Sequence, residues 1–267
     1  MYAVVNLGLL FTELPWRQRF AAAAEAGFHR VEFPWPPLAP DEVTRLVREA
    51  GIQVALLNMD AGDLAAGERG YGNDPRLTVR WRDQLRQALD LARDLDCPLV
   101  NVLAGRRLPG LDEPDQVRCL TVNLRWAADL AARYARTLVI EPINDHDIPG
   151  YLFPRVVDVL AALDELDHEA VKLQLDAYHV AAMGDDVSRA VAAAGSRLGH
   201  VQLADHPGRH EPGTGDLDVD ALLAALTAAG YRGGLGLEYE PTMPSAASLR
   251  AVTARHPRLR PAEERPV

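Results

Sequence analysis

The sequence lacks long hydrophobic runs, contains few cysteines and has fewer basic than acidic residues. No run approaches the roughly 18 apolar residues of a membrane span, and the first residues, MYAVVN, do not resemble a secretory signal. With only 2 cysteines in 267 residues, a disulfide scaffold is excluded. The net charge of -10 argues against a nucleic-acid backbone as the main partner. We therefore expect a cytoplasmic protein with neither a membrane nor a nucleic-acid partner.

The sequence instead has an ordinary globular composition and a repeating pattern of short apolar runs. Hydrophobic residues make up 48% of the chain and charged residues 25%. Most of the runs are separated by one amphipathic helical pattern. The runs are residues 3–8, 30–33, 52–58, 99–103, 138–141, 171–176, 198–203 and 235–238. Eight such units in a chain of this length predict a single (β/α)8 TIM barrel.

The helical segments between these runs have clear start and stop signals. Pro40 precedes two acidic residues and Gly51 follows the apolar pattern, which predicts a helix over 40–50. No linker divides the chain, so residues 1–255 are predicted to form one domain. Residues 256–267 are rich in Arg, Pro and Glu and are predicted to form a flexible tail.

Two connections are unusually long. Residues 61–74 contain four glycines, and residues 204–216 read ADHPGRHEPGTGD. Both follow strands, so both are expected at the carboxyl-terminal face of the barrel, where the active sites of this fold lie. Neither matches a phosphate-binding fingerprint.

Polar residues with metal-ligand chemistry lie at the ends of four predicted strands. They are Glu141, Asp176, Gln202 and Glu238. Side chains alternate between the faces of a strand, so these four point into the barrel while their apolar neighbours pack outward. One such residue alone is usually a solvated loop residue or a cap. Several inward carboxylates repel one another, however, and a cation removes that cost. Because the donors are all hard oxygens, we expect Mg²⁺ or Mn²⁺.

Two histidines lie close to these predicted ligands in the sequence. His179 follows Asp176 by three residues and is expected to orient a ligand or a bound water. His200 lies lower on its strand and is expected to be a hydrogen-bonded interior histidine. Glu141 and Glu238 can flank a substrate held by the cation, which suits isomerisation or epimerisation by proton transfer through a metal-stabilised enediolate.

Several motifs resemble those of the hydroxypyruvate isomerase family, within the xylose-isomerase-like TIM barrels that also include ketose 3-epimerases. The motifs are AGDLAAGERG (61–70), IEPIN (140–144), DIPG (147–150), DAYH (176–179), HVQ (200–202), PGRHEPGTG (207–215) and EY (238–239). The resemblance implies a divalent-metal isomerase that interconverts hydroxypyruvate and tartronate semialdehyde, or acts on 2-oxo-tetronate type substrates. It implies Glu141, Asp176, Gln202 and Glu238 as metal ligands, with Glu141 and Glu238 as the acid/base pair. Gln202 favours this family, because the 3-epimerases usually have histidine there.

The acidic substrates of this family require cationic contacts. Arg209 and Arg69, on the two long loops, are the candidate substrate-binding residues, together with His179. One residue departs from the resemblance. Many relatives have lysine two residues after the last glutamate, where this chain has Glu240. An acid at that position would weaken the recognition of an acidic substrate and favour a neutral sugar.

Other functions remain open from the sequence alone. A ketose 3-epimerase or another sugar isomerase would use the same residues, and a non-catalytic sugar- or metal-binding protein would need fewer of them. Endonucleases that act on abasic DNA share the barrel type, but they carry several histidines for zinc and need a basic face. The absence of histidine among the four strand-end residues disfavours them. Relatives are often dimers or tetramers, so a homo-oligomer is expected.

Overall fold

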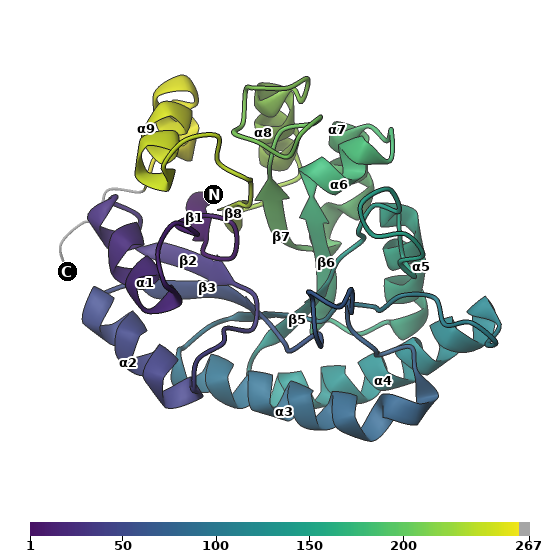
Figure 1. Cartoon of the computed structure of the whole chain (residues 1–267). Helices are drawn as coiled ribbons and strands as arrows, with labels where there is room; N and C mark the ends of the chain where they lie inside the picture. Colours follow the sequence, from purple (N-terminus) through teal and green to yellow (C-terminus); the bar gives the residue numbers. More distant parts are fainter. Residues whose placement is uncertain (262–267) are drawn as a thin grey trace.

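In the computed structural model, which describes residues 1–261, the eight predicted strands form a closed parallel barrel in chain order (Figure 1). The strands are β1 (Tyr2–Asn6), β2 (Arg30–Phe33), β3 (Gln53–Asn58), β4 (Leu99–Asn101), β5 (Thr137–Ile140), β6 (Val171–Asp176), β7 (Leu198–Leu203) and β8 (Gly234–Leu237). The predicted (β/α)8 barrel is confirmed. Glu141 and Glu238 lie one residue beyond β5 and β8, where the chain leaves the sheet for the carboxyl-terminal face.

Helices surround the barrel (Figure 1). They are α1 (Trp16–Glu25), α2 (Pro40–Ala50), α3 (Thr78–Asp94), α4 (Glu113–Arg133), α5 (Val156–Leu166), α6 (Ala177–Ala182), α7 (Val187–Ala194), α8 (Val219–Ala228) and α9 (Ser245–Arg255), with 3-10 turns η1 (Pro75–Leu77), η2 (Gly195–Arg197) and η3 (Pro257–Leu259). Helix α2 begins at Pro40 and is followed by Gly51 with φ 63°, a left-handed conformation that favours glycine. Its predicted start and stop signals are therefore confirmed.

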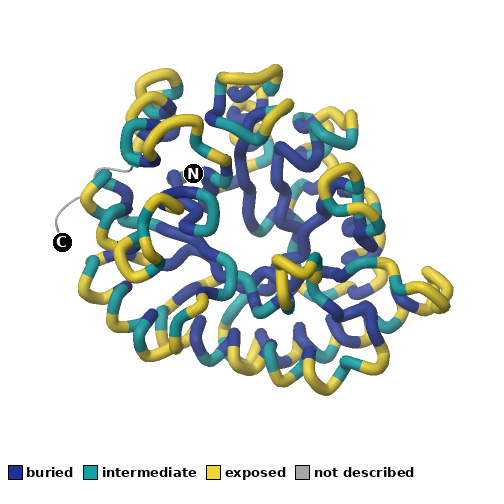
Figure 2. The backbone as a smooth tube through the Cα atoms, in the orientation of Figure 1, coloured by how far each residue is buried: buried dark blue, intermediate teal, exposed yellow. Residues whose placement is uncertain are grey.

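The core lies between the strands and the inner faces of the helices, while the outer helix faces are exposed (Figure 2). In β2, for example, Phe33 contacts Phe20 of α1 edge to face, with the ring centroids 5.8 Å apart. Phe33 thus points out of the barrel toward a helix. Its neighbour Glu32 therefore points inward, as strand alternation requires.

The end of the described chain is more ordered than its composition indicates. After α9, residues Pro257–Leu259 form the turn η3, and Leu259 is only 1% exposed. Residues 256–261 of the predicted tail therefore pack on the barrel through Leu259, whereas residues 262–267 lie outside the described residues. Among residues 1–261, no helix is long and apolar enough to cross a membrane.

Candidate active site

The four predicted strand-end residues come together at the carboxyl-terminal end of β5 to β8. Asp176 is the last residue of β6 and pairs in register with Gln202 of β7, which in turn pairs with Gly236 of β8. Glu141 and Asp176 are buried. The side chain of Glu238 is 17% exposed, so it lies at the edge of this cluster of acids.

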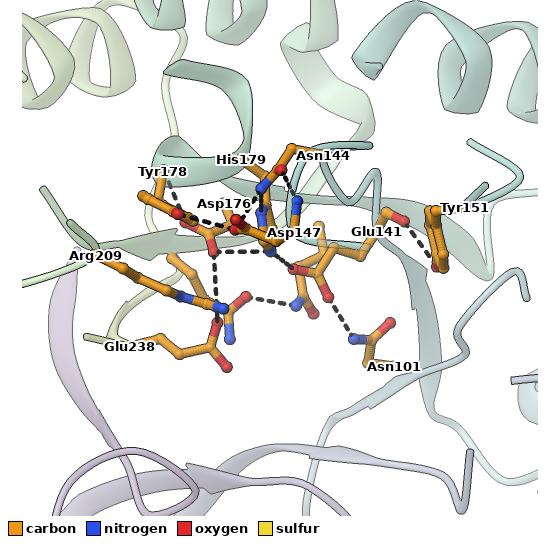
Figure 3. Close-up of polar contacts among 12 residues, drawn as sticks. Asn101, Glu141, Asn144, Asp147, Tyr151, Asp176, Tyr178, His179, Arg209 and Glu238 are labelled. Carbon is orange, nitrogen blue, oxygen red and sulfur yellow. Dashed lines mark hydrogen bonds and ion pairs between the residues drawn. The ribbon is translucent and has the colours of Figure 1, made fainter. Parts of the chain in front are cut away.

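His179 lies against two of these acids (Figure 3). Its Nε2 is 3.6 Å from Oδ2 of Asp176 and 3.9 Å from Oε1 of Glu141. The ligand atoms of Glu141, Asp176 and His179 all lie within 4.8 Å of one another. Helix α6 begins directly after Asp176, whose Oδ1 accepts a hydrogen bond from Tyr178 N at 2.9 Å. The short helix thus brings the His179 ring back over the strand end.

The hydrogen bonds of His179 indicate which ring nitrogen carries the proton. Asn144 Oδ1 accepts hydrogen bonds from the backbone N–H groups of His146 and Asp147, so its amide nitrogen faces Nδ1 of His179, at 2.6 Å. Burial lowers the pKa of His179 well below its ordinary value, so the ring is neutral. With Nδ1 accepting, Nε2 carries the hydrogen and faces the acids, at distances of 3.6 and 3.9 Å that are too long for a hydrogen bond. Because its Nε2 is protonated, His179 is better suited to orient a ligand or a substrate than to coordinate a metal ion.

Arg209 links Asp176 to Glu238 (Figure 3). Its Nη2 lies 2.8 Å from Oε2 of Glu238 and 3.4 Å from Oδ2 of Asp176. The guanidinium carbon is 5.2 Å from the centre of the Tyr178 ring. The loop that carries Arg209 is fixed by the buried Asp205, which accepts hydrogen bonds from the backbone N–H groups of His206, Gly213 and Leu217. The structure thus places this predicted substrate-binding residue in the cluster.

The acids of the cluster share an environment that disfavours their charge. Burial, followed by the charge of Asp176, raises the pKa of Glu141 to about 8. Burial also raises the pKa of Asp176, and it raises that of Glu238 well above its ordinary value, although Arg209 opposes both shifts. Burial lowers the pKa of Arg209, but Glu238, Asp176 and Glu141 outweigh it and raise that pKa overall. One arginine is therefore too little positive charge for three carboxylates.

Two neutral donors that the sequence analysis missed hold the glutamates. Asn101, the last residue of β4, donates to Oε2 of Glu141 at 3.0 Å. Asn6, the last residue of β1, donates to Oε1 of Glu238 at 2.9 Å. The signal was present, because both are polar residues at strand ends, like the four that were selected. Extending the same rule to the first half of the barrel would have found them.

Gln202 belongs to a second buried layer beside the acids. Its Oε1 accepts a hydrogen bond from Nε2 of Gln174 at 2.6 Å, and its own Nε2 donates to Oε1 of Glu32 at 2.7 Å. A carbonyl oxygen has two lone pairs, so the first bond leaves Oε1 able to coordinate a cation. His200 lies in the same layer and is fully buried, with its Nε2 2.6 Å from Oε2 of Glu32. The expectation of a hydrogen-bonded interior histidine agrees with this position.

The side chains of Arg69 and Glu240 make no contact with the acids of the cluster. Nη1 of Arg69 donates to the carbonyls of Leu64 and Glu68 at 2.8 and 2.7 Å, so this arginine braces its own loop. Glu240 is exposed. Its backbone N–H donates to the carbonyl of Arg209 at 2.7 Å. The acidic side chain of Glu240 therefore adds no charge to the buried cluster.

The residues present fit a divalent cation. Glu141, Asp176 and Glu238 offer carboxylate oxygens and Gln202 an amide oxygen, a donor set typical of Mg²⁺ and Mn²⁺. The raised pKa values of the acids show the electrostatic reason, because two added positive charges would offset their mutual repulsion. A parallel barrel with such a cluster at its carboxyl-terminal mouth defines the class of TIM-barrel enzymes.

Comparison with known proteins places the chain within that class. A family model described as xylose isomerase-like TIM barrel matches residues 20–255. A hydroxypyruvate isomerase of Escherichia coli K12 is 35% identical over 92% of this chain and 95% of its own length. A 2-oxo-tetronate isomerase of Pectobacterium atrosepticum is 35% identical over 88% of this chain and 90% of its own length. The chain therefore belongs to the xylose isomerase-like TIM barrel family, in the group of hydroxypyruvate and 2-oxo-tetronate isomerases.

A solved structure agrees with this fold over almost its whole length. It is a protein from Brucella melitensis described as an AP endonuclease of family 2. The two chains superpose with a TM-score of 0.90 at 34% identity, and the match covers 96% of this chain and 99% of that one. The predicted resemblance to hydroxypyruvate isomerases is confirmed by the curated relatives, while this structure shows that the whole described barrel is shared.

Proposed function

We propose that the chain is a divalent-metal-dependent isomerase of small hydroxy-carbonyl acids, converting hydroxypyruvate to tartronate semialdehyde or acting on 2-oxo-tetronate type substrates. The observation that carries the proposal is the convergence of two glutamates on Asp176. The neutral ring of His179 lies over Asp176 and Glu141, with Nε2 3.6 Å from Oδ2 of Asp176 and 3.9 Å from Oε1 of Glu141. Arg209 forms ion pairs with Asp176 and Glu238. The names of the relatives support the reaction and the substrate class.

The proposed chemistry is a proton transfer between adjacent carbons. For hydroxypyruvate, a carboxylate removes a proton from the hydroxymethyl carbon, and a proton is then delivered to the former carbonyl carbon. The hydroxyl proton of the hydroxymethyl group passes to the former carbonyl oxygen, so that the hydroxymethyl carbon becomes the aldehyde. Glu141 and Glu238 perform these two steps in the proposal, since each is held by an amide donor at a different side of the mouth.

Glu141, Asp176, Gln202 and Glu238 would hold Mg²⁺ or Mn²⁺. When bound, the cation supplies Lewis-acid stabilisation of the negative oxygen that develops when the proton leaves. The chain's own task is to arrange the substrate. In the proposal, the guanidinium of Arg209 binds the substrate carboxylate, and the Nε2–H of His179 donates to a substrate oxygen.

A second candidate is a ketose 3-epimerase or another sugar isomerase acting at the same acids. It is favoured by Glu240, which replaces the lysine that the resemblance implies for acid recognition. Since Glu240 is exposed and adds no charge to the cluster, we rank the hydroxy-acid isomerase first. A homo-oligomer remains a prediction from the resemblance.

The deciding experiment is an assay of metal-stripped protein with hydroxypyruvate, with and without added Mn²⁺ or Mg²⁺, following tartronate semialdehyde. Metal-dependent turnover is expected. Parallel reactions with a four-carbon 2-oxo acid, a neutral ketose and an abasic DNA duplex complete the test. Metal-dependent turnover of the ketose alone would replace the first candidate by the second, and cleavage of the duplex alone would overturn both.

A further inference from the structure

Below the acids, the barrel holds a buried polar layer centred on Glu32. This side chain is fully buried on the inward face of β2. Its Oε1 accepts from Nδ2 of Asn6 at 3.0 Å and from Nε2 of Gln202 at 2.7 Å, and its Oε2 lies 2.6 Å from Nε2 of His200. A carboxylate among three N–H groups acts only as an acceptor, so its partners must turn their nitrogens toward it.

We propose that Glu32 is a positioning residue, which orients Gln202 and Glu238 for the cation. A primary amide has a donor end and an acceptor end that are similar in shape. Glu32 accepts a hydrogen bond from Nε2 of Gln202, so Oε1 of Gln202 points away from Glu32. On that side Gln174 donates a hydrogen bond to Oε1. Only that oxygen can coordinate a cation. The proposal rests on the proposed function, since the cation gives this orientation its purpose.

The link from Glu32 to Glu238 passes through Asn6. Oδ1 of Asn6 accepts a hydrogen bond from the backbone N–H of Gly8 at 2.8 Å, which fixes the amide at its acceptor end. Its Nδ2 then donates one hydrogen to Glu32 and the other to Oε1 of Glu238, at 2.9 Å. Asn6 thus joins the two carboxylates: Gly8 determines that its nitrogen faces them, and Glu32 holds one of the two hydrogens while Glu238 accepts the other.

The barrel is shaped to admit this layer. A Cβ added at Gly236 would lie 2.5 and 2.6 Å from the two carboxylate oxygens of Glu32, so any side chain there would displace them. A Cβ at Gly234 would lie 3.2 Å from Cε1 of His200. The two glycines thus leave space for Glu32 and His200 on the inward face of β8. Leu235 and Leu237, which alternate with the glycines along the strand, are buried on the other face.

Two irregularities in the strand pairing fall at the same layer. The register of β2 against β3 shifts between Val31 and Glu32, and that of β6 against β7 shifts between Leu173 and Gln174. Shifts of this kind re-aim the side chains that follow them. Both are followed by a residue of the layer. A buried pair such as Glu32 and His200 adds little stability compared with apolar residues of similar volume, so the layer is better explained by orientation than by stability.

The test compares Mn²⁺ affinity, measured by calorimetry, in the wild type, Glu32→Gln, Glu32→Asp and Gly236→Ala. Glu32→Gln places an NH2 donor among the three N–H groups that face this position and is expected to weaken Mn²⁺ binding about 10–100-fold. Gly236→Ala is expected to do the same by displacing the carboxylate. Glu32→Asp keeps an acceptor-only group and is expected to retain more of the affinity than Glu32→Gln.

The matched control is Gln116→Leu. Gln116 is a buried amide that bonds Asn73, Leu108 and Leu111 and none of the site residues. This variant is expected to lower the unfolding temperature while leaving Mn²⁺ affinity unchanged. Wild-type Mn²⁺ affinity in Glu32→Gln would overturn the proposal. If Glu32→Gln does not fold, Glu32→Asp and Gly236→Ala decide, and wild-type affinity in both overturns it.

A crystal structure of the substituted protein separates this proposal from the proposed function. If the wild type binds no Mn²⁺, the metal-dependent function fails, but the orientations can still be compared. A Gln202 amide and a Glu238 carboxylate that keep their positions in Glu32→Gln would overturn the positioning role. A turned amide, or a Glu238 released from Asn6, is the expected result.

Discussion

The two halves of the barrel bring different chemistry to the same mouth. Strands β5 to β8 carry the predicted ligands Glu141, Asp176, Gln202 and Glu238, together with Arg209 on the loop after β7. Strands β1, β2 and β4 carry Asn6, Glu32 and Asn101, which contact those ligands through hydrogen bonds. The second half thus supplies the acids, and the first half fixes how they point. The site is therefore defined by hydrogen-bonded pairs of residues, one from each half of the barrel, rather than by the residues of one half.

The largest expected effect comes from the acids of the second half. Glu238→Gln keeps the shape of the side chain but removes its capacity to accept a proton, so we expect turnover of the proposed substrate to fall by at least about 10³-fold. Glu141→Gln should behave in the same way. Initial rates with saturating Mn²⁺ measure the effect.

Glu240→Gln is the matched control for that experiment, because Glu240 lies two residues from Glu238 and is exposed. It should retain turnover within about twofold, since a surface charge is screened by solvent. Full activity in Glu238→Gln would contradict the two-glutamate mechanism and would leave the second half without its proposed function.

A smaller effect is expected from the first half. Asn101→Ala removes the donor to Oε2 of Glu141 while leaving the acid in place. Loss of such an orienting contact typically lowers activity 10–100-fold, and we expect a fall in kcat within that range with little change in KM. Asn123→Ala is the control, because Asn123 is equally buried but donates to the carbonyl of Gly72. Equal losses of activity in both variants would show a general effect of destabilisation.

The sequence predicted the acids because their signal is local. Alternation along a strand places Asp176 inward, and the same argument applies to Glu141 and Glu238 at the strand ends. The contact between Asn6 and Glu238 joins residues 232 positions apart. Such a pair depends on closure of the barrel, where β1 meets β8. Strand periodicity contains no information about which inward residues face each other across that seam.

The irregular features were out of reach for a related reason. The register shift before Glu32 arises from the pairing of β2 with β3, and the path that brings Arg209 onto Asp176 depends on the loop hydrogen bonds of Asp205. Composition likewise suggested a flexible tail from residue 256, yet Leu259 finds an apolar surface and is buried. In each case tertiary contacts outweigh the local pattern.

The pH dependence of stability tests whether the acids of the second half are as crowded as their pKa values indicate. Glu141 has an ordinary pKa of 4.5, raised to about 8 in the folded chain, so the folded chain holds the extra proton between those values. The free energy of unfolding of metal-stripped protein should therefore fall as pH rises toward 8, by at most about 1.4 kcal/mol per pH unit for this group.

The window from pH 6.5 to 8 separates the effect of the acids from that of His179. The lowered pKa of His179 has the opposite sign, destabilising the folded chain as pH falls, but it acts below the ordinary histidine value of 6.5. Urea unfolding at several pH values measures the slope. Glu141→Gln should reduce the slope, and saturating Mn²⁺ should remove it. A slope unchanged by Glu141→Gln would show that Glu141 is not the group whose raised pKa causes the pH dependence.

The smallest effect is expected for Arg69, the substrate-binding candidate on a first-half loop. Its guanidinium already donates to two carbonyls of that loop, whereas Arg209 contacts the acids directly. If the two halves differ as argued, Arg69→Gln should raise KM by no more than about threefold with kcat unchanged, because it loosens a loop without removing a charge from the cluster. A rise in KM equal to that of Arg209→Gln would show that Arg69 contacts the substrate, and that the first half of the barrel also takes part in substrate binding.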